Sequence, residues 1–347
     1  MTTMSEVPSR QSYVEQVRQW LPGAYERYDG QIDDWRRTHG AGSAFGEIQT
    51  PGAPITLAHV EAFLAVEDGD EALATRAVER MLTLRQFADE IPRELVPEHG
   101  AYRDRPLPPQ ANMFILPYYL EAYALLREGD CFSAGDHTTM QAIIADSVAP
   151  IFHFPEWGSH NRAMLRAWVL AAAAAVCPDR PERERWQQMG EQIAADSLRG
   201  WSVEDAAGYH AIWSRALLRY VDVTGQADSF FREPTARFYF EYYLNLICPL
   251  GTLADFGDSD WGPDPQLFLT SFEGAARQYQ DRHFRWAAAE MYRRLATRHE
   301  GPWFGNPSNW IHAAGWVDDR LPPAEPDWGS REVLEELAGK KVVFRSG

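Results

Sequence analysis

The stretch from Gly200 to Tyr220, GWSVEDAAGYHAIWSRALLRY, decides the expected fold. Its large apolar side chains recur every three or four residues, so they share one face of a helix. They are Tyr209, Ile212, Trp213, Ala216, Leu217 and Tyr220. Two carboxylates, Glu204 and Asp205, precede this face, and Tyr209 and His210 stand where it begins. The pattern predicts a helix over 205–224 whose start carries groups able to transfer a proton.

The same helical period extends outward from this stretch over most of the chain. It predicts further helices near 12–21, 55–67, 70–90, 112–128, 136–150, 161–176, 181–198, 233–247, 266–280, 282–297 and 330–338. Glycine and proline separate them, for example at Gly69, Gly129, Pro178 and Gly225. Helices joined by short links form antiparallel hairpins. About six hairpins without a repeat of fixed length predict an all-α fold, an (α/α) toroid.

Three longer stretches interrupt the helices, and the end of the chain changes character. The stretches are Glu26 to Thr50, Pro97 to Gln110 and Gly251 to Pro265. The last residues, from Lys340 to Phe344, give a strand signal. Because a single strand is not stable alone, we expect residues 339–347 to begin a β segment or a linker to a missing β domain. Residues 1–338 then form the toroidal catalytic domain.

Composition limits the classes of partner. The chain of 347 residues carries 33 Lys and Arg against 50 Asp and Glu, a net charge of −17. Nucleic acid needs a basic surface, so it is not an expected partner. The high content of Trp and Tyr is typical of surfaces that stack on sugars. Oligomeric state does not follow from the sequence.

Cysteine usage and the N-terminus bear on location. Cys131, Cys177 and Cys248 form no CxxC pair, which is compatible with a reducing compartment. The first residues lack the apolar core of a signal peptide, and no apolar run is long enough to span a membrane. We therefore expect a cytoplasmic protein without membrane contact, with export possible if a leader has been lost.

The first candidate site is the segment Trp157-Gly158-Ser159-His160-Asn161-Arg162 at the start of the helix over 161–176. An imidazole and an amide at a helix N-terminus suit an anion, because the positive end of the helix dipole lies beneath them. The alternative is that Ser159 or Asn161 only caps the helix.

The second candidate is the start of the helix over 205–224. Asp205 and Tyr209 share a face, whereas Tyr209 and His210 diverge around the helix axis. Tyr209 could equally be an ordinary core aromatic residue. His210 could equally be a capping or solvent-facing residue.

Two further clusters are polar. Asp255, Asp258 and Asp260 lie next to Trp261, but their spacing lacks the EF-hand pattern, and such turns are commonly structural. We expect no metal and no other cofactor. Asn306, Asn309, Trp310 and His312 form a polar and aromatic cluster suited to binding a sugar.

Together these motifs resemble the heparinase II/III-like and alginate-lyase-like polysaccharide lyases. The resemblance covers about residues 155–347. It depends on His160-Asn161, the segment Ser202 to His210, the segment Asp255 to Trp261, and the tail Lys341 to Gly347. Many relatives have Asn before His or Trp, and here His160 comes first, so either side chain could face the substrate. The family implies a helical toroid followed by a β-sandwich.

The resemblance also implies a carbon–oxygen lyase acting on polysaccharides that contain uronic acid. β-Elimination removes the proton at C5, which requires the adjacent carboxylate to be neutralised. Asn161 suits that role. Tyr209 suits the role of acid or base, with His210 or His160 as a partner base. The expected contacts to the substrate are Arg162, Glu204, Trp261, Asn309 and Trp310.

Two other functions stay open on the sequence. A glycoside hydrolase on a similar toroid would use paired carboxylates, drawn from Glu204, Asp205, Asp258 and Asp260. A non-catalytic sugar-binding helical scaffold would bury both Asn161 and Tyr209 completely within its core. The product separates the two enzyme classes, because only a lyase leaves an unsaturated sugar end that absorbs in the ultraviolet.

Overall fold

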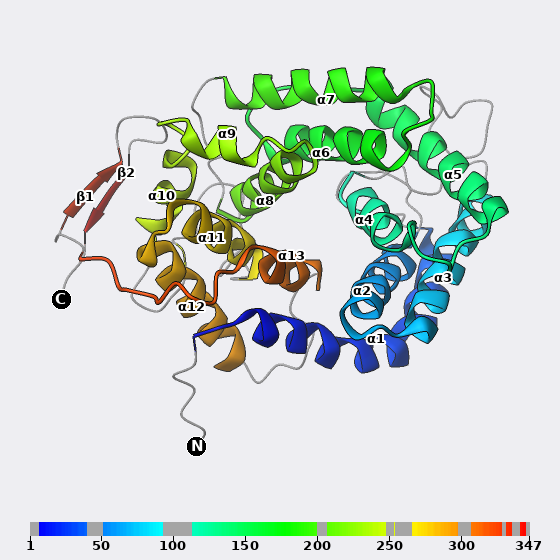
Figure 1. Ribbon diagram of the computed structural model, residues 1–347, viewed down its shortest axis with the longest axis horizontal. Coiled ribbons are helices and arrows are strands. Elements are labelled where there is room, and N and C mark those ends of the chain that lie inside the picture. The colour runs from blue at the N-terminus through cyan, green and yellow to red at the C-terminus, as the bar shows by residue number, and fades with distance from the viewer. Residues whose placement is uncertain are drawn as a thin grey trace. The chain divides into compact units, whose positions relative to one another are not determined.

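The computed structural model describes residues 7–39, 51–92, 113–199, 207–247, 253, 266–297, 307–327, 331–334 and 341–344. Within these residues the chain forms thirteen helices and one two-stranded antiparallel hairpin (Figure 1). The helices are α1 (Arg10–Thr38), α2 (Gly52–Asp68), α3 (Glu71–Asp89), α4 (Leu116–Leu126), α5 (Ala134–His153), α6 (Asn161–Val176), α7 (Arg183–Leu198), α8 (Ala207–Val223), α9 (Ala227–Arg232), α10 (Phe238–Leu244), α11 (Gln266–Tyr279), α12 (Arg282–Thr297) and α13 (Ser308–Trp316). The predicted all-α class is confirmed. Closure of the hairpins into a toroid stays a prediction, as does the division at residue 338.

Glycines end helices where the sequence predicts a break. Gly69 follows α2 with φ of 66° and ψ of 32°, and its N–H donates to the carbonyl of Ala65. Gly225 follows α8 with φ of 68°. This left-handed conformation strains residues that carry a Cβ, so glycine is the residue that ends these helices without cost.

The first helix is longer than predicted. The expected helix end at residue 21 is wrong, and so is the irregular stretch from Glu26 as far as Thr38, because α1 continues to Thr38. The rest of that stretch, over 40–50, lies outside the described residues. A proline inside a helix removes one backbone hydrogen bond. Packing compensates, since Ile32 and Trp35 lie one turn apart and are both buried. The Trp35 ring meets the edge of Phe87 at 5.6 Å.

The predicted helix over 233–247 begins later and is shorter than expected, and the reason is a proline. Glu233 has φ of −65° and ψ of 125°, the extended conformation imposed on a residue that precedes proline, here Pro234. The helix therefore begins only at Phe238, as α10, and the preceding segment, where no helix was expected, forms the short helix α9. A second difference is α13, which occupies a segment where no helix was expected.

The C-terminal prediction is half right. The strand signal before the end is confirmed by β2 (Lys341–Phe344), but the expected helix over 330–338 is wrong. Its first part is the strand β1 (Arg331–Leu334), which pairs with β2 in antiparallel register. Strand pairing supplies the backbone partners that β2 cannot supply for itself.

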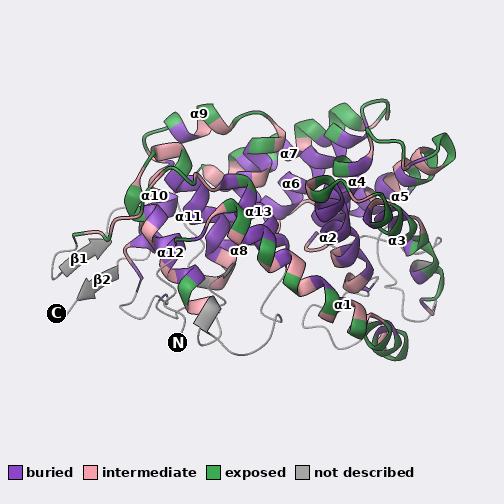
Figure 2. Cartoon of the chain, turned by 60° about the horizontal axis from the view of Figure 1, so that its bottom comes forward, coloured by how far each residue is buried: buried purple, intermediate pink, exposed green. Residues whose placement is uncertain are grey.

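The chain divides into two units, each with its own packing. Unit 1 comprises Met1–Val17, Trp157–Met164 and Ile193–Gly347, and unit 2 comprises Arg18–Glu156 and Leu165–Gln192. In unit 2, α2 packs against α3 and α4, and α5 packs against α3. Most residues of α2 and α4 are buried (Figure 2). In unit 1, α11 packs against α8, α12 and α13.

Candidate functional site

The start of α6 is shaped by His160, which occupies the position before the helix. Its Nδ1 accepts a hydrogen bond from the backbone N–H of Ala163 at 3.4 Å. Its Nε2 donates to the carbonyl of Trp157 at 3.0 Å, since a carbonyl can only accept. His160 is thus the capping residue, in place of the expected Ser159 or Asn161. Both nitrogens of its ring are engaged in the turn.

The same turn is fixed to the end of α7. The N–H of Gly158, whose φ is 108°, donates to Asp196 at 2.9 Å, and the hydroxyl of Ser159 donates to the carbonyl of Ser197 at 2.5 Å. These bonds set where α6 begins. Asn161 is the first residue of the helix and is only 5% exposed, and Arg162 after it is partly exposed.

The start of α8 carries the other predicted pair. Tyr209 is partly exposed, whereas His210 is only 1% exposed. The imidazole of His210 stacks on Tyr243 at 4.2 Å and on Trp213 at 5.3 Å between ring centroids. Its Nε2 donates to the carbonyl of Tyr239 at 2.9 Å. Burial lowers the pKa of His210 to about 3, so the ring is neutral near pH 7.

Ser197, at the end of α7, is bonded both to the turn before α6 and to the second turn of α8. Its carbonyl accepts from Ser159, before α6, and its hydroxyl accepts from the indole N–H of Trp213, on α8, at 2.9 Å. The helix that begins at Asn161 and the helix that carries Tyr209 are therefore both fixed to the same residue of unit 1, α6 through the turn before it and α8 one turn beyond Tyr209. This arrangement around Ser197 is the candidate site.

The predicted sugar contacts on α13 are buried. Asn309 is fully buried, and its side-chain oxygen accepts from the guanidinium of Arg215 on α8. Trp310 is also buried, with its ring 6.1 Å from Tyr13 and 5.9 Å from Tyr292. In this structure Asn309 and Trp310 join α13 to neighbouring elements of unit 1, and neither is placed at a surface.

Several predicted residues lie outside the described part of the chain. They are Glu204, Asp205, Asp255, Asp258, Asp260, Trp261 and Asn306. The paired carboxylates of the hydrolase alternative and the expected contact of Trp261 with a sugar therefore stay predictions.

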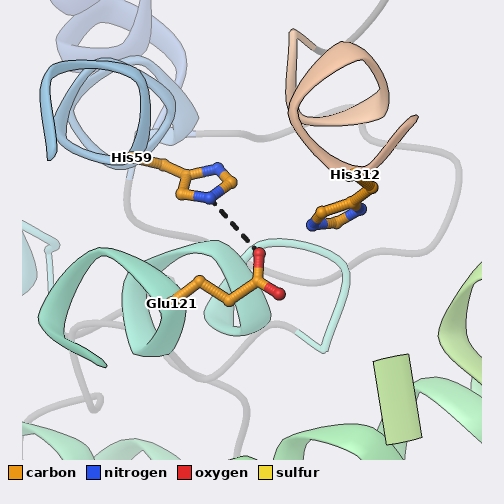
Figure 3. Close-up of side chains that lie close together, drawn as sticks. All are labelled: His59, Glu121 and His312. Atoms are coloured by element: carbon orange, nitrogen blue, oxygen red, sulfur yellow. Dashed lines mark ion pairs between the residues drawn. The ribbon is translucent and has the colours of Figure 1, made fainter. Parts of the chain in front are cut away.

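Unit 2 holds a buried ionisable pair that the sequence reading missed (Figure 3). His59 on α2 and Glu121 on α4 approach to 3.3 Å between Nε2 and Oε2, and both are buried. The ring of Tyr118 stacks on His59 at 5.7 Å. The sequence feature that could have predicted this pair is an ionisable residue within a largely apolar helical segment. His59 lies in ITLAHVEAFLAV, and Glu121 lies in LPYYLEAYALL.

Arginines of α6 and α8 differ in burial. In unit 2, Arg166 is buried and forms an ion pair with Glu156 at 2.8 Å. In unit 1, Arg215 is buried against Asn309. Arg162, the expected substrate contact, is partly exposed.

Comparisons with known proteins add no assignment. No protein-family model matches the chain, and no curated protein matches it. Among the described residues, no helix is both long enough and apolar enough to cross a membrane.

Proposed function

We propose that the protein is a polysaccharide lyase that cleaves a glycan containing uronic acid by β-elimination. The observation that supports the proposal is the shared anchoring of two helices on Ser197, one that begins at Asn161 and one that carries Tyr209 in its first turn. A pair of this kind supplies the two functions that the reaction needs, a donor for the carboxylate and a group that moves a proton. The (α/α) toroid belongs to the same proposal.

The proposed chemistry assigns one step to each residue. The amide of Asn161 donates to the carboxylate of the uronate, which makes the C5 proton more acidic by stabilising the charge that develops there. Arg162, next along the helix, adds positive charge. The phenolate of Tyr209 takes the C5 proton. The electrons of the C–H bond form the C4–C5 double bond, and the bond from C4 to the leaving oxygen breaks.

The leaving oxygen then requires a proton. His160 and His210 are the predicted partners of Tyr209, but each holds its Nε2–H on a backbone carbonyl. The proposal therefore gives both proton transfers to Tyr209, which returns the proton it has taken from C5 to the departing sugar. The partial exposure of Tyr209 favours this role over that of a core aromatic residue. It also favours an enzyme over a non-catalytic scaffold, which would bury both Asn161 and Tyr209 completely.

The test is a panel of alginate, glucuronan and glycosaminoglycans, scored by ultraviolet absorbance of the product. A lyase generates the absorbing unsaturated end, whereas a hydrolase that used paired carboxylates would generate new reducing ends without absorbance. Absence of absorbance on every polymer, with folded protein, would reject the lyase assignment.

The active polymer then allows a test of Tyr209. Tyr209→Phe keeps the ring but removes the hydroxyl, so turnover should fall by on the order of 10²–10⁴ with little change in melting temperature. Tyr220→Phe is the matched control, because Tyr220 is a buried tyrosine further along the same helix. It should keep its turnover. Full activity in folded Tyr209→Phe would contradict the mechanism.

A further inference from the structure

His210 anchors the first turn of α8. Its ring lies between Tyr243, at an interplanar angle of 14°, and Trp213, at 25°. The bond from Nε2 to the carbonyl of Tyr239 fastens it to α10 as well. Aromatic stacking and a buried hydrogen bond each resist displacement, and both act here on the residue next to Tyr209.

The protonation state of His210 follows from its partners. Because a carbonyl accepts the bond, Nε2 carries the hydrogen. Nδ1 is buried and has no hydrogen-bond partner among the described residues. The facing titratable groups are Tyr239 and Tyr243 of α10, and burial raises the pKa of Tyr239 to about 12, which keeps it neutral. Near neutral pH the ring is thus a neutral Nε2–H imidazole.

This geometry is unsuited to proton exchange with a substrate. A general base has to lie within hydrogen-bond reach of the proton that it abstracts. Here Nε2 is occupied by a backbone carbonyl, and Nδ1 is enclosed by the packing of unit 1. The stacking and the hydrogen bond hold the ring in place, and neither nitrogen is accessible to a substrate. Both observations indicate that His210 holds the helix and does not transfer a proton.

We infer that His210 is a positioning residue, which fastens the first turn of α8 to α10 and so fixes the phenol of Tyr209 for proton transfer. The inference rests on the proposed lyase function, and it replaces the role of partner base for His210. A small displacement of a reacting group is enough to reduce turnover substantially, which is why an anchor beside Tyr209 matters.

Two substitutions separate the parts of the anchor. His210→Phe keeps the stacking and removes the hydrogen bond, whereas His210→Gln keeps an N–H donor and loses most of the stacking. For His210→Phe we expect kcat to fall by roughly 10–100-fold, with KM nearly unchanged. His210→Gln should recover part of the loss. Met140→Ala, a core truncation on α5 of unit 2, is the control and should lower the melting temperature without changing kcat.

The pH profile separates positioning from catalysis. If His210 positions Tyr209, the profile of kcat between about pH 5 and pH 8 keeps its shape in both variants. Loss of an ionisation from that profile would assign proton transfer to His210 and overturn the inference. Unchanged kcat in His210→Phe would overturn it as well.

A second measurement needs no turnover and so distinguishes failure of the inference from failure of the proposed function. With 3-fluorotyrosine placed only at position 209, ¹⁹F NMR should give one sharp signal in the otherwise wild-type protein and broadened or multiple signals in His210→Phe. Amide exchange in the first turn of α8 should accelerate in the same variant. Unchanged spectra and exchange would overturn the anchoring role, whatever the panel of polysaccharides shows.

Discussion

Tyr209 and His210 are neighbours in the sequence, yet the structure gives them opposite surroundings. Successive residues of a helix point in directions about 100° apart, so one can face the interior while the other stays partly accessible. His210 is enclosed by Trp213 and Tyr243, whereas Tyr209 keeps partial exposure. At the scale of the residue, the phenol is therefore the better candidate for a group that meets a substrate.

Substitutions of His160 can distinguish a role in capping α6 from a role in catalysis. Asparagine is among the best residues at the capping position, so His160→Asn should unfold with a free energy within about 0.5 kcal/mol of wild type. His160→Ala, which lacks the acceptor, should lose about 1 kcal/mol. Urea denaturation measures both values. Turnover of His160→Asn should match wild type, and a folded but inactive His160→Asn would show instead that the imidazole takes part in the reaction.

At the scale of the element, a buried network docks the beginning of α1. The hydroxyl of Tyr13 and the guanidinium of Arg285 both donate to Oε1 of Glu273, each at 2.5 Å, and Arg285 also donates to the carbonyl of Pro8. All three side chains are at most 1% exposed. Burial, with a smaller contribution from Asp319, raises the pKa of Glu273 to about 7. This value includes the lowering effect of Arg285.

The Glu273 network predicts a pH dependence of stability. Because the folded pKa of about 7 exceeds the ordinary 4.5, the contribution is fully present below about pH 4.5 and is lost as pH rises through about 7. The loss should be on the order of 3 kcal/mol. Urea unfolding across this range should show the decline in wild type relative to Glu273→Gln, which cannot titrate. Parallel curves for the two proteins would contradict the shift.

Close packing of α6 and α7 in unit 2 gives a prediction with a matched control. A Cβ at Gly190 would lie 3.2 Å from the carbonyl oxygen of Ala167 and 3.4 Å from Cβ of Leu170. Gly190→Ala should therefore destabilise by about 1–3 kcal/mol. Gly30, exposed within α1, has nothing within 4 Å, so Gly30→Ala should stabilise by up to about 1 kcal/mol. Chemical denaturation measures both, and equal effects would refute the packing argument.

At the scale of the whole molecule, the net charge of −17 opposes the approach of a polyuronate. Arg162 is a partly exposed cation at the candidate site. We expect the local attraction by Arg162 to outweigh this repulsion at the site. The ratio kcat/KM should then fall as ionic strength rises from about 0.01 M to about 0.15 M, because a screening length that shortens from about 30 Å to about 8 Å weakens that attraction. Arg162→Gln should lower kcat/KM and flatten this dependence.

The control for Arg162 is Arg320→Gln, which removes the same charge from an exposed pair with Asp318. It should leave the salt dependence close to wild type. If both substitutions change kcat/KM alike, only the total charge matters, and Arg162 has no particular contact with the substrate.

Local sequence patterns were sufficient to predict the helical class and many helix positions. The expected helices over 161–176 and 282–297 have the same bounds as α6 and α12. Apolar periodicity and the residues that break helices are local properties, so they can be read from neighbouring residues. Short strands and the effect of proline on helix ends were harder to predict. The strand β1 was expected to be helical, and Pro234 separates α9 from α10.

The length of α1 and the surroundings of the site residues depend on contacts between residues far apart in the sequence. α1 continues beyond Pro22 because Trp35 packs against Phe87, more than fifty positions later. His210 is a buried, neutral anchor because α10 supplies the Tyr239 carbonyl and the Tyr243 ring. Burial and hydrogen-bond partners come from residues distant in sequence, and a helical pattern shows which residues share a face without showing what that face meets.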